Sequence, residues 1–176
     1  LPMGKTAGPY GTQRPRALLV DDDPQALDHL ELLLSSRYPD LELTTRMTPD
    51  VSGAFDFYFL DNDFEGELRA GQLAREIRTR APEALVVAFS GTLDIETLKG
   101  LINAGCDGAA EKGVPSSLRP ILALVEKRLS EMVDSHKRAA GPFGGVKHAA
   151  GSIRDILEDW NERPAEADEV ERRKSA

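Results

Sequence analysis

The feature that most constrains this chain is a series of short runs with the character of β-strands, each followed at once by polar or charged residues. The runs lie at residues 17–20, 41–45, 55–60, 85–89 and 107–110, and those at 17–20, 55–60 and 85–89 are rich in apolar residues. Continuous apolar runs of this length are typical of strands that are buried on both faces of a parallel sheet. Segments with apolar residues at helical spacing separate most of the runs. This alternation predicts an α/β fold, in which helices cover both faces of a parallel sheet.

The first helix is predicted over residues 24–36, where leucines recur at helical spacing. Asp23 is a suitable N-cap and Pro24 a suitable first helical residue. Similar patterns predict helices around residues 73–77, over residues 98–105 and from Ser116 onward. The last of these is long, and its apolar stripe past Val125 exceeds what one sheet face needs. We therefore expect that part to be a surface for a partner.

The connection between the second and third strands is unusually short. Only residues 46–54 separate them, and they include Pro49 and Gly53. A parallel crossover normally takes about ten to twelve residues or more. The shortened second crossover is therefore expected to contain one helical turn at most.

Chemically active side chains follow the ends of four of the predicted strands. They are Asp21, Asp22, Asp23, Asp61, Asn62, Asp63, Ser90 and Lys112. Because ligands of such sheets bind beyond the carboxyl ends of the strands, we expect these groups to converge on one edge. Clustered carboxylates without histidine or cysteine favour Mg²⁺. A carboxylate can also accept a phosphoryl group, whose charge a metal, a lysine and a hydroxyl would then neutralise.

These signatures, in this order, resemble the receiver domain of two-component response regulators. The matching segments are residues 18–24, 59–61 and 89–91 together with Lys112, and the resemblance runs from about residue 16 to residue 129. It implies a flavodoxin-like, doubly wound five-stranded parallel sheet in the order 2-1-3-4-5.

The resemblance also implies roles in phosphoryl transfer. Asp61 would be the phosphoacceptor, Ser90 would hydrogen-bond the phosphoryl group, and Lys112 would pair with it. Such a protein is not a classical enzyme, because it only assists its own phosphorylation and dephosphorylation.

A magnesium site is implied by the same resemblance. Asp22 and Asp61 would bind Mg²⁺ directly, while Asp21 would orient the waters of the metal. Asp63 would contribute its backbone carbonyl.

The sequence departs from the family pattern in several places. Gly113 stands where the family usually has proline, and Ala109 stands where it often has a Tyr or Phe switch. The loop over residues 62–70 lacks the usual Met-Pro and is about two residues longer. All the residues of the family's phosphorylation site are present. The residues that would carry a signal from the site to an output differ from the family pattern.

The chain is expected to divide into five segments. They are a flexible lead at 1–15, the receiver domain at 16–135, a Gly/Pro linker at 136–145, an amphipathic helix at 146–163 and a charged tail at 164–176. A helix with the stripe Val146, Ala150, Ile153, Leu157 and Trp160 needs a surface to cover. We expect it to dock on the receiver domain or on a partner.

Composition limits the possible partners and compartments. The net charge is −8 and no basic cluster is present, which argues against nucleic-acid binding. A single cysteine, Cys106, expected to be buried and inert, fits a reducing compartment. Without a signal segment or a run of 18 apolar residues, the expected location is cytoplasmic and away from the membrane.

The main functional hypothesis is a phosphorelay switch that takes its phosphoryl group from a sensor histidine kinase or phosphotransfer protein. It would signal through a downstream protein, with a possible homodimer and without a DNA-binding output. One alternative is a pseudo-receiver, a scaffold that is not phosphorylated. Another is a phosphatase of the haloacid-dehalogenase type, since Asp61-Asn62-Asp63 fits its Asp-x-Asp motif. That family needs a further acidic pair after Lys112, and it would leave Asp21 and Asp22 unexplained.

Overall fold

The structure is a computed structural model that describes residues 8–11 and 13–140. The chain divides into two compact units, Leu1–His136 and Lys137–Ala176, and the parallel sheet lies in the first. Its main strands are β1 (Arg16–Val20), β2 (Glu42–Arg46), β3 (Phe57–Asp61), β6 (Leu85–Ser90) and β7 (Gly108–Glu111). The helices are α1 (Pro24–Arg37), α2 (Ala70–Arg80), α3 (Ile95–Ala104) and α4 (Pro115–Ala139). A small hairpin consists of β4 (Asp63–Phe64) and β5 (Glu67–Leu68).

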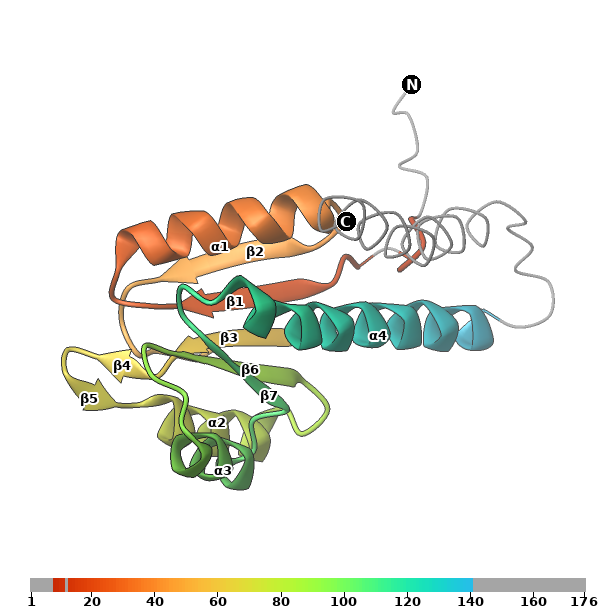
Figure 1. Ribbon diagram of the computed structural model, residues 1–176. Helices are drawn as coiled ribbons and strands as arrows, with labels where there is room; N and C mark the ends of the chain where they lie inside the picture. Colours follow the sequence, from red (N-terminus) through yellow and green to blue (C-terminus); the bar gives the residue numbers. More distant parts are fainter. Residues whose placement is uncertain (1–7, 12, 141–176) are drawn as a thin grey trace, which may run out of the picture. The chain divides into compact units, whose positions relative to one another are not determined.

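The five main strands form one parallel sheet in the order β2-β1-β3-β6-β7. This is the predicted flavodoxin-like order. Figure 1 shows α1 and α4 on one face of the sheet, with α2 and α3 on the other. The fold class derived from the alternation of strands and helices is therefore confirmed.

The central strand β3 is buried along its whole length and supplies both layers of the core. Phe57 and Phe59 pack toward α1 and α4, whereas Tyr58 and Leu60 pack toward α2 and α3. Alternate side chains of a strand point to opposite faces, so a strand covered on both faces must be apolar throughout. Asp61, the last residue of this strand, is the exception to its apolar sequence, and this position matters for function.

The ends of two helices follow ordinary capping chemistry. Asp23 caps α1 by accepting a hydrogen bond from the Gln25 N–H, as predicted. Asp94 caps α3 in the same manner, by accepting from Thr97. Gly105 ends α3 with φ of 110°, a left-handed conformation that favours glycine.

The crossover between β2 and β3 contains no helix, in agreement with the shortness of this segment. Arg46 organises it by donating hydrogen bonds to the carbonyls of Asp50 and Ser52. Val51 and Phe55 are buried and fill the core on the α2 and α3 face. Arg46, Val51 and Phe55 thus stabilise this crossover, which has no helix.

Some expected boundaries are wrong by a few residues. The second and third strands begin one or two residues later than predicted and include Arg46 and Asp61. The hairpin at β4 and β5 was not predicted. In the expected flexible lead, residues 8–11 form a turn closed by a Gly8–Gly11 bridge, and Tyr10 packs against the core.

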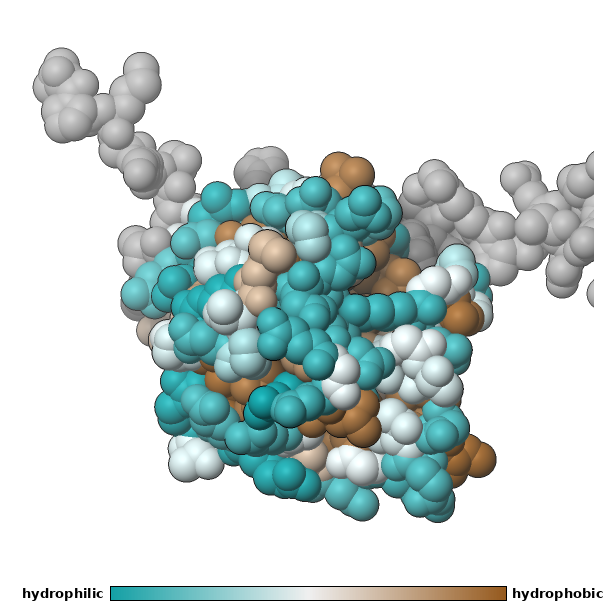
Figure 2. All heavy atoms as spheres, turned by 90° about the vertical axis from the view of Figure 1, so that its left-hand side faces the viewer, coloured by the Kyte–Doolittle hydropathy of each residue, from teal (hydrophilic) through white to brown (hydrophobic). Residues whose placement is uncertain are grey.

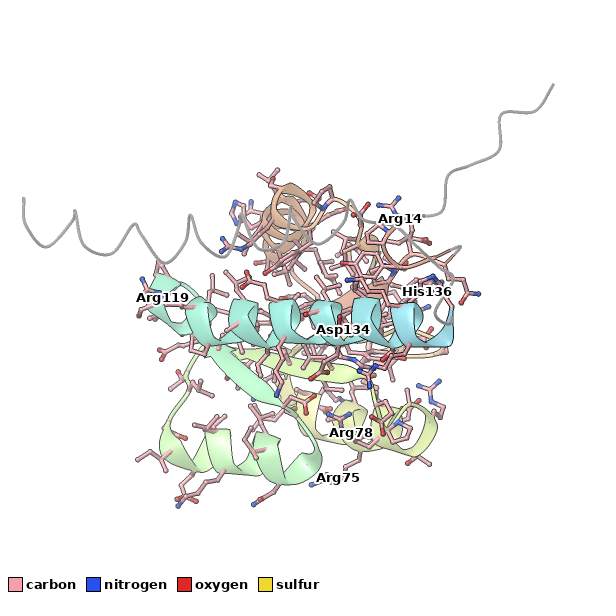
Figure 3. The ribbon with its side chains drawn as sticks, turned by 90° about the vertical axis from the view of Figure 1, so that its right-hand side faces the viewer. Arg14, Arg75, Arg78, Arg119, Asp134 and His136 are labelled. Carbon is pink, nitrogen blue, oxygen red and sulfur yellow. The ribbon has the colours of Figure 1, made fainter. Side chains whose placement is uncertain are left out.

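The long helix α4 also differs from its prediction. It extends to Ala139, so residues 136–139 are helical and not part of a linker. Figure 3 shows α4 crossing this side of the domain, with Arg119 and His136 near its opposite ends. Leu129 belongs to the same core cluster as Ile121 and Val125, so the stripe past Val125 packs on this domain. The rest of the predicted linker, the amphipathic helix at 146–163 and the tail lie outside the described residues.

Candidate functional site

Three carboxylates converge at the carboxyl ends of β1 and β3. Asp21, Asp22 and Asp61 each offer a carboxylate oxygen, and these oxygens all lie within 4.8 Å of one another. Asp21 and Asp61 are buried, with 8% and 2% of their surface exposed, while Asp22 is half-buried. Figure 2 views the domain from this end, where hydrophilic side chains predominate around smaller apolar areas. Three predicted site residues are thus brought together.

Lys112 completes the cluster from the loop after β7. Its Nζ lies 2.7 Å from Asp21 Oδ2 and 2.8 Å from Asp61 Oδ1. Burial lowers the pKa of Lys112, but hydrogen bonds and charge attraction from Asp21 and Asp61 outweigh it and leave the pKa raised. The Lys112 N–H donates to the Ser90 carbonyl at 2.8 Å, which fixes the loop against β6. The site therefore holds a permanent ammonium between two carboxylates.

Asp61 has two oxygens in different environments. Oδ1 accepts hydrogen bonds from Lys112 and from the Asp63 N–H, the latter at 3.2 Å. Oδ2 is buried and has no hydrogen-bond partner among the described residues. Burial raises the pKa of Asp61 above its ordinary value, partly opposed by the hydrogen bond from Lys112. A buried polar atom without a partner is costly, so Oδ2 fits an oxygen that a cation or substrate engages.

The three successive aspartates have three different roles. Asp21 accepts a hydrogen bond from the Asp23 N–H at 2.9 Å in addition to its pair with Lys112. Asp22 accepts from the Glu65 N–H at 2.9 Å, which ties it to the tip of the β4–β5 hairpin. Asp23 caps α1. Only the first two face the cluster, which explains why the run of three is needed.

Ser90, the last residue of β6, is also buried, but its hydroxyl is engaged elsewhere. Its Oγ donates to the Thr92 carbonyl at 2.8 Å. The side-chain amide of Asn62 donates to the Ser90 Oγ at 3.5 Å. The sequence placed Asn62 at this edge of the sheet but assigned it no functional role. Its position directly after the candidate acceptor was the available signal.

Asp63 opens the hairpin and its side chain is exposed. Its carboxylate is not a member of the three-carboxylate group. The role of its carbonyl stays a prediction.

The donor set suits a hard divalent cation. Three carboxylates supply only oxygen, the ligand type that Mg²⁺ prefers, and one of them has the unpartnered Oδ2. A pocket of about 420 Å³ adjoins the cluster between α1 and the start of α4, with Asp61 and Lys112 at one side and Leu30, Leu33 and Leu118 among its apolar lining. A partner or substrate can therefore reach the site from this side.

The departures from the family pattern have local explanations. Gly113 has φ of 77°, which a proline ring cannot adopt. Ala109 is partly buried against the core on the α2 and α3 face. Cys106 is buried as expected, and burial, with a further contribution from Asp107, raises the pKa of its thiol to about 11.

Comparison with solved structures identifies the fold. The BeF3-activated receiver domain of DrrB matches with a TM-score of 0.57 and 22% identity, over 67% of this chain and 99% of that one. A CheY-like receiver domain protein from Methanospirillum hungatei matches with a TM-score of 0.55 and 21% identity, over 72% and 99%. Response regulator TrrA from Thermotoga maritima, in complex with Mg(2+)-BeF, matches with a TM-score of 0.53 and 22% identity, over 65% and 98%.

The domain thus has the fold of response-regulator receiver domains, as the sequence resemblance implied. No protein-family model matches the chain, and no curated protein matches it significantly. Within the described ranges, no helix is both long and apolar enough to cross a membrane.

Proposed function

We propose that this chain is a phosphorelay switch in which Asp61 accepts a phosphoryl group from a sensor histidine kinase or phosphotransfer protein. One observation carries the proposal. Asp61 is a buried carboxylate at the end of the central strand, held at Oδ1 by the Lys112 ammonium while Oδ2 has no partner among the described residues. A structural carboxylate in a core would be fully paired, whereas a nucleophile needs an oxygen in reserve.

The chemistry follows from this arrangement. A carboxylate oxygen of Asp61 attacks phosphorus, the bond from phosphorus to the donor histidine nitrogen breaks, and its electron pair stays on that nitrogen. Negative charge on the transferring oxygens is met by the Lys112 ammonium, already 2.8 Å from Asp61, and by the hydroxyl of Ser90. The ammonium is already in place, whereas the Ser90 proton has to turn away from the Thr92 carbonyl.

A bound Mg²⁺ would add positive charge next to the same oxygens. Asp22 and Asp61 would hold it directly, Asp21 through water, and Asp63 through its carbonyl. The convergence of three carboxylates supports this assignment, because without a cation they repel one another. The single positive charge of Lys112 offsets only part of the repulsion among the three carboxylates.

We place the output in protein contacts in the cytoplasm, without DNA binding. The net charge of −8 and the absence of a basic cluster in the sequence support this, since a polyanion would be repelled. The small Ala109 cannot act as an aromatic switch, so the signal must leave the site by another element. A homodimer remains a prediction.

Intact-mass spectrometry after incubation with acetyl phosphate and Mg²⁺ tests the proposal. Wild type should gain one phosphoryl group, and Asp61→Asn should gain none. Asp28→Asn, at an exposed position of α1, is the matched control and should be labelled like wild type.

Equal labelling of wild type and Asp61→Asn would remove Asp61 as the acceptor. A wild type that binds Mg²⁺ but is never labelled, either by acetyl phosphate or by a histidine-phosphorylated donor, would instead indicate a pseudo-receiver.

A further inference from the structure

We propose that Asn62 is a positioning residue that orients the hydroxyl of Ser90 for the phosphoryl group on Asp61. The inference rests on the proposed function and deepens it. Asn62 and Ser90 are both buried, with 3% and 2% of their surface exposed, and the Asn62 Nδ2 lies 3.5 Å from the Ser90 Oγ.

Asn62 is mounted rigidly beside the acceptor. Its backbone N–H donates to the Phe89 carbonyl at 2.7 Å, and its carbonyl accepts from the Arg69 N–H at 2.9 Å. The first bond continues the ladder between β3 and β6, and the second fixes the residue to the start of α2. The amide is therefore presented to Ser90 by a backbone that is held on both sides.

The hydrogen-bond capacity of a hydroxyl explains what this contact does. Ser90 has one proton to donate and two lone pairs with which to accept. The N–H of Asn62 occupies one lone pair, while the proton of Ser90 goes to the Thr92 carbonyl at 2.8 Å. Asn62 thus contacts the oxygen from one side, while its proton points to Thr92 and can turn to another acceptor.

A phosphoryl group on Asp61 would offer a charged acceptor in place of the neutral carbonyl of Thr92. Hydrogen bonds to charged acceptors are about twice as strong as those between neutral groups. The Ser90 proton would turn to the phosphoryl oxygen while Asn62 keeps the serine oxygen in place. No covalent bond changes in this step, and no proton leaves Ser90.

A purely structural role is the competing explanation. An apolar residue of similar size would fill the same space without burying an amide, whose removal from water is costly. Structural and positioning roles differ in one measurable respect. A positioning residue acts through Ser90 and loses its effect when the serine hydroxyl is absent, whereas a structural residue does not.

A double-mutant cycle in the full chain measures this difference. The variants are Asn62→Leu, Ser90→Ala and the combination, and the readout is the rate of Asp61 phosphorylation by acetyl phosphate. In the serine background Asn62→Leu should slow labelling roughly three- to tenfold, the worth of one hydrogen bond. In the Ser90→Ala background the same change should alter the rate less than about twofold. Asn103→Leu, at an exposed position of α3, should leave the rate unchanged.

Equal slowing in both backgrounds, or no slowing in either, would overturn the role of Asn62 and leave the proposed function standing. A wild type that is never labelled would overturn both. Thermal unfolding identifies a variant that does not fold, and Asn62→Ala, which is smaller and removes the same donor, then replaces Asn62→Leu in the cycle.

Discussion

Lys112 and Asp21 lie 91 residues apart in the sequence, yet the lysine Nζ donates to Asp21 Oδ2 over 2.7 Å. The same nitrogen reaches Asp61, so one ammonium joins the loops after β7 and β1 to the end of β3. The charged groups of the site therefore also link these three segments of the fold.

Removing that ammonium should therefore destabilise the metal-free protein. Lys112→Met leaves Asp21 and Asp61 close together and largely out of water with no cation between them. We expect the free energy of unfolding to fall by about 1–3 kcal/mol. Urea denaturation without divalent ions measures it.

Lys99→Met is the control for that experiment, because Lys99 forms an exposed pair with Glu96 in α3. Exposed pairs of this kind contribute roughly 0–1 kcal/mol. A loss in Lys112→Met no larger than in Lys99→Met would show that the buried cluster does not depend on its lysine.

Mg²⁺ should stabilise the wild type, since a ligand that binds only the folded state raises its stability. Asp22→Ala should abolish this effect, because it removes one of the three convergent carboxylates. In the apo protein, relief of repulsion should raise stability and loss of the hydrogen bond from the Glu65 N–H should lower it, so the net change should be small. Thermal unfolding with and without Mg²⁺ gives both values, and a midpoint indifferent to Mg²⁺ in the wild type would contradict the metal site.

Replacing Gly113 or Gly100 by alanine should change the stability of the protein in opposite directions. Gly113 has φ of 77°, so Gly113→Ala should cost about 1 kcal/mol and Gly113→Pro more. Gly100 lies within α3, where an added Cβ meets nothing within 4 Å. Gly100→Ala should therefore stabilise by about 0.5–1 kcal/mol. Chemical denaturation checks both, and a stabilising Gly113→Ala would be inconsistent with the left-handed loop.

Cys106 should react slowly with iodoacetamide near neutral pH. Burial raises the pKa of its thiol to about 11, so the thiolate is scarce, and alkylation should accelerate steadily from pH 8 to pH 10. The raised pKa also means that folding favours the neutral thiol, and this contribution to stability is lost as the pH rises toward 11. Mass spectrometry follows the reaction. In urea it should become fast, and fast alkylation of the folded protein at pH 7 would disprove the burial.

Much of this site was accessible from the sequence because strand ends are easy to recognise. Each predicted strand is followed by a polar residue, and parallel topology gathers those residues at one edge. The short connection at residues 46–54 likewise predicted a crossover without a full helix, which the structure confirms.

Other features depend on contacts that no local pattern encodes. The β4–β5 hairpin has strands of two residues each, and its turn places Glu65 at φ of 49°, a conformation that glutamate rarely adopts. The burial of Asn62 and the double pairing of Lys112 are set by strands distant in sequence. Which carboxylate oxygens a lysine will reach cannot be deduced from its place after a strand.

The all-parallel order of the sheet has a consequence for folding. Each neighbour of β3 is joined to it through a crossover, and the residues of the cluster run from Asp21 to Lys112. Long-range pairings of this kind form slowly, because chain entropy is lost before the contacts are gained. No hairpin or helix pair formed early can contain the three carboxylates and the ammonium together. Metal affinity should consequently emerge only once β1 and β3 have paired, and Mg²⁺ would favour molecules in which this central pair is assembled.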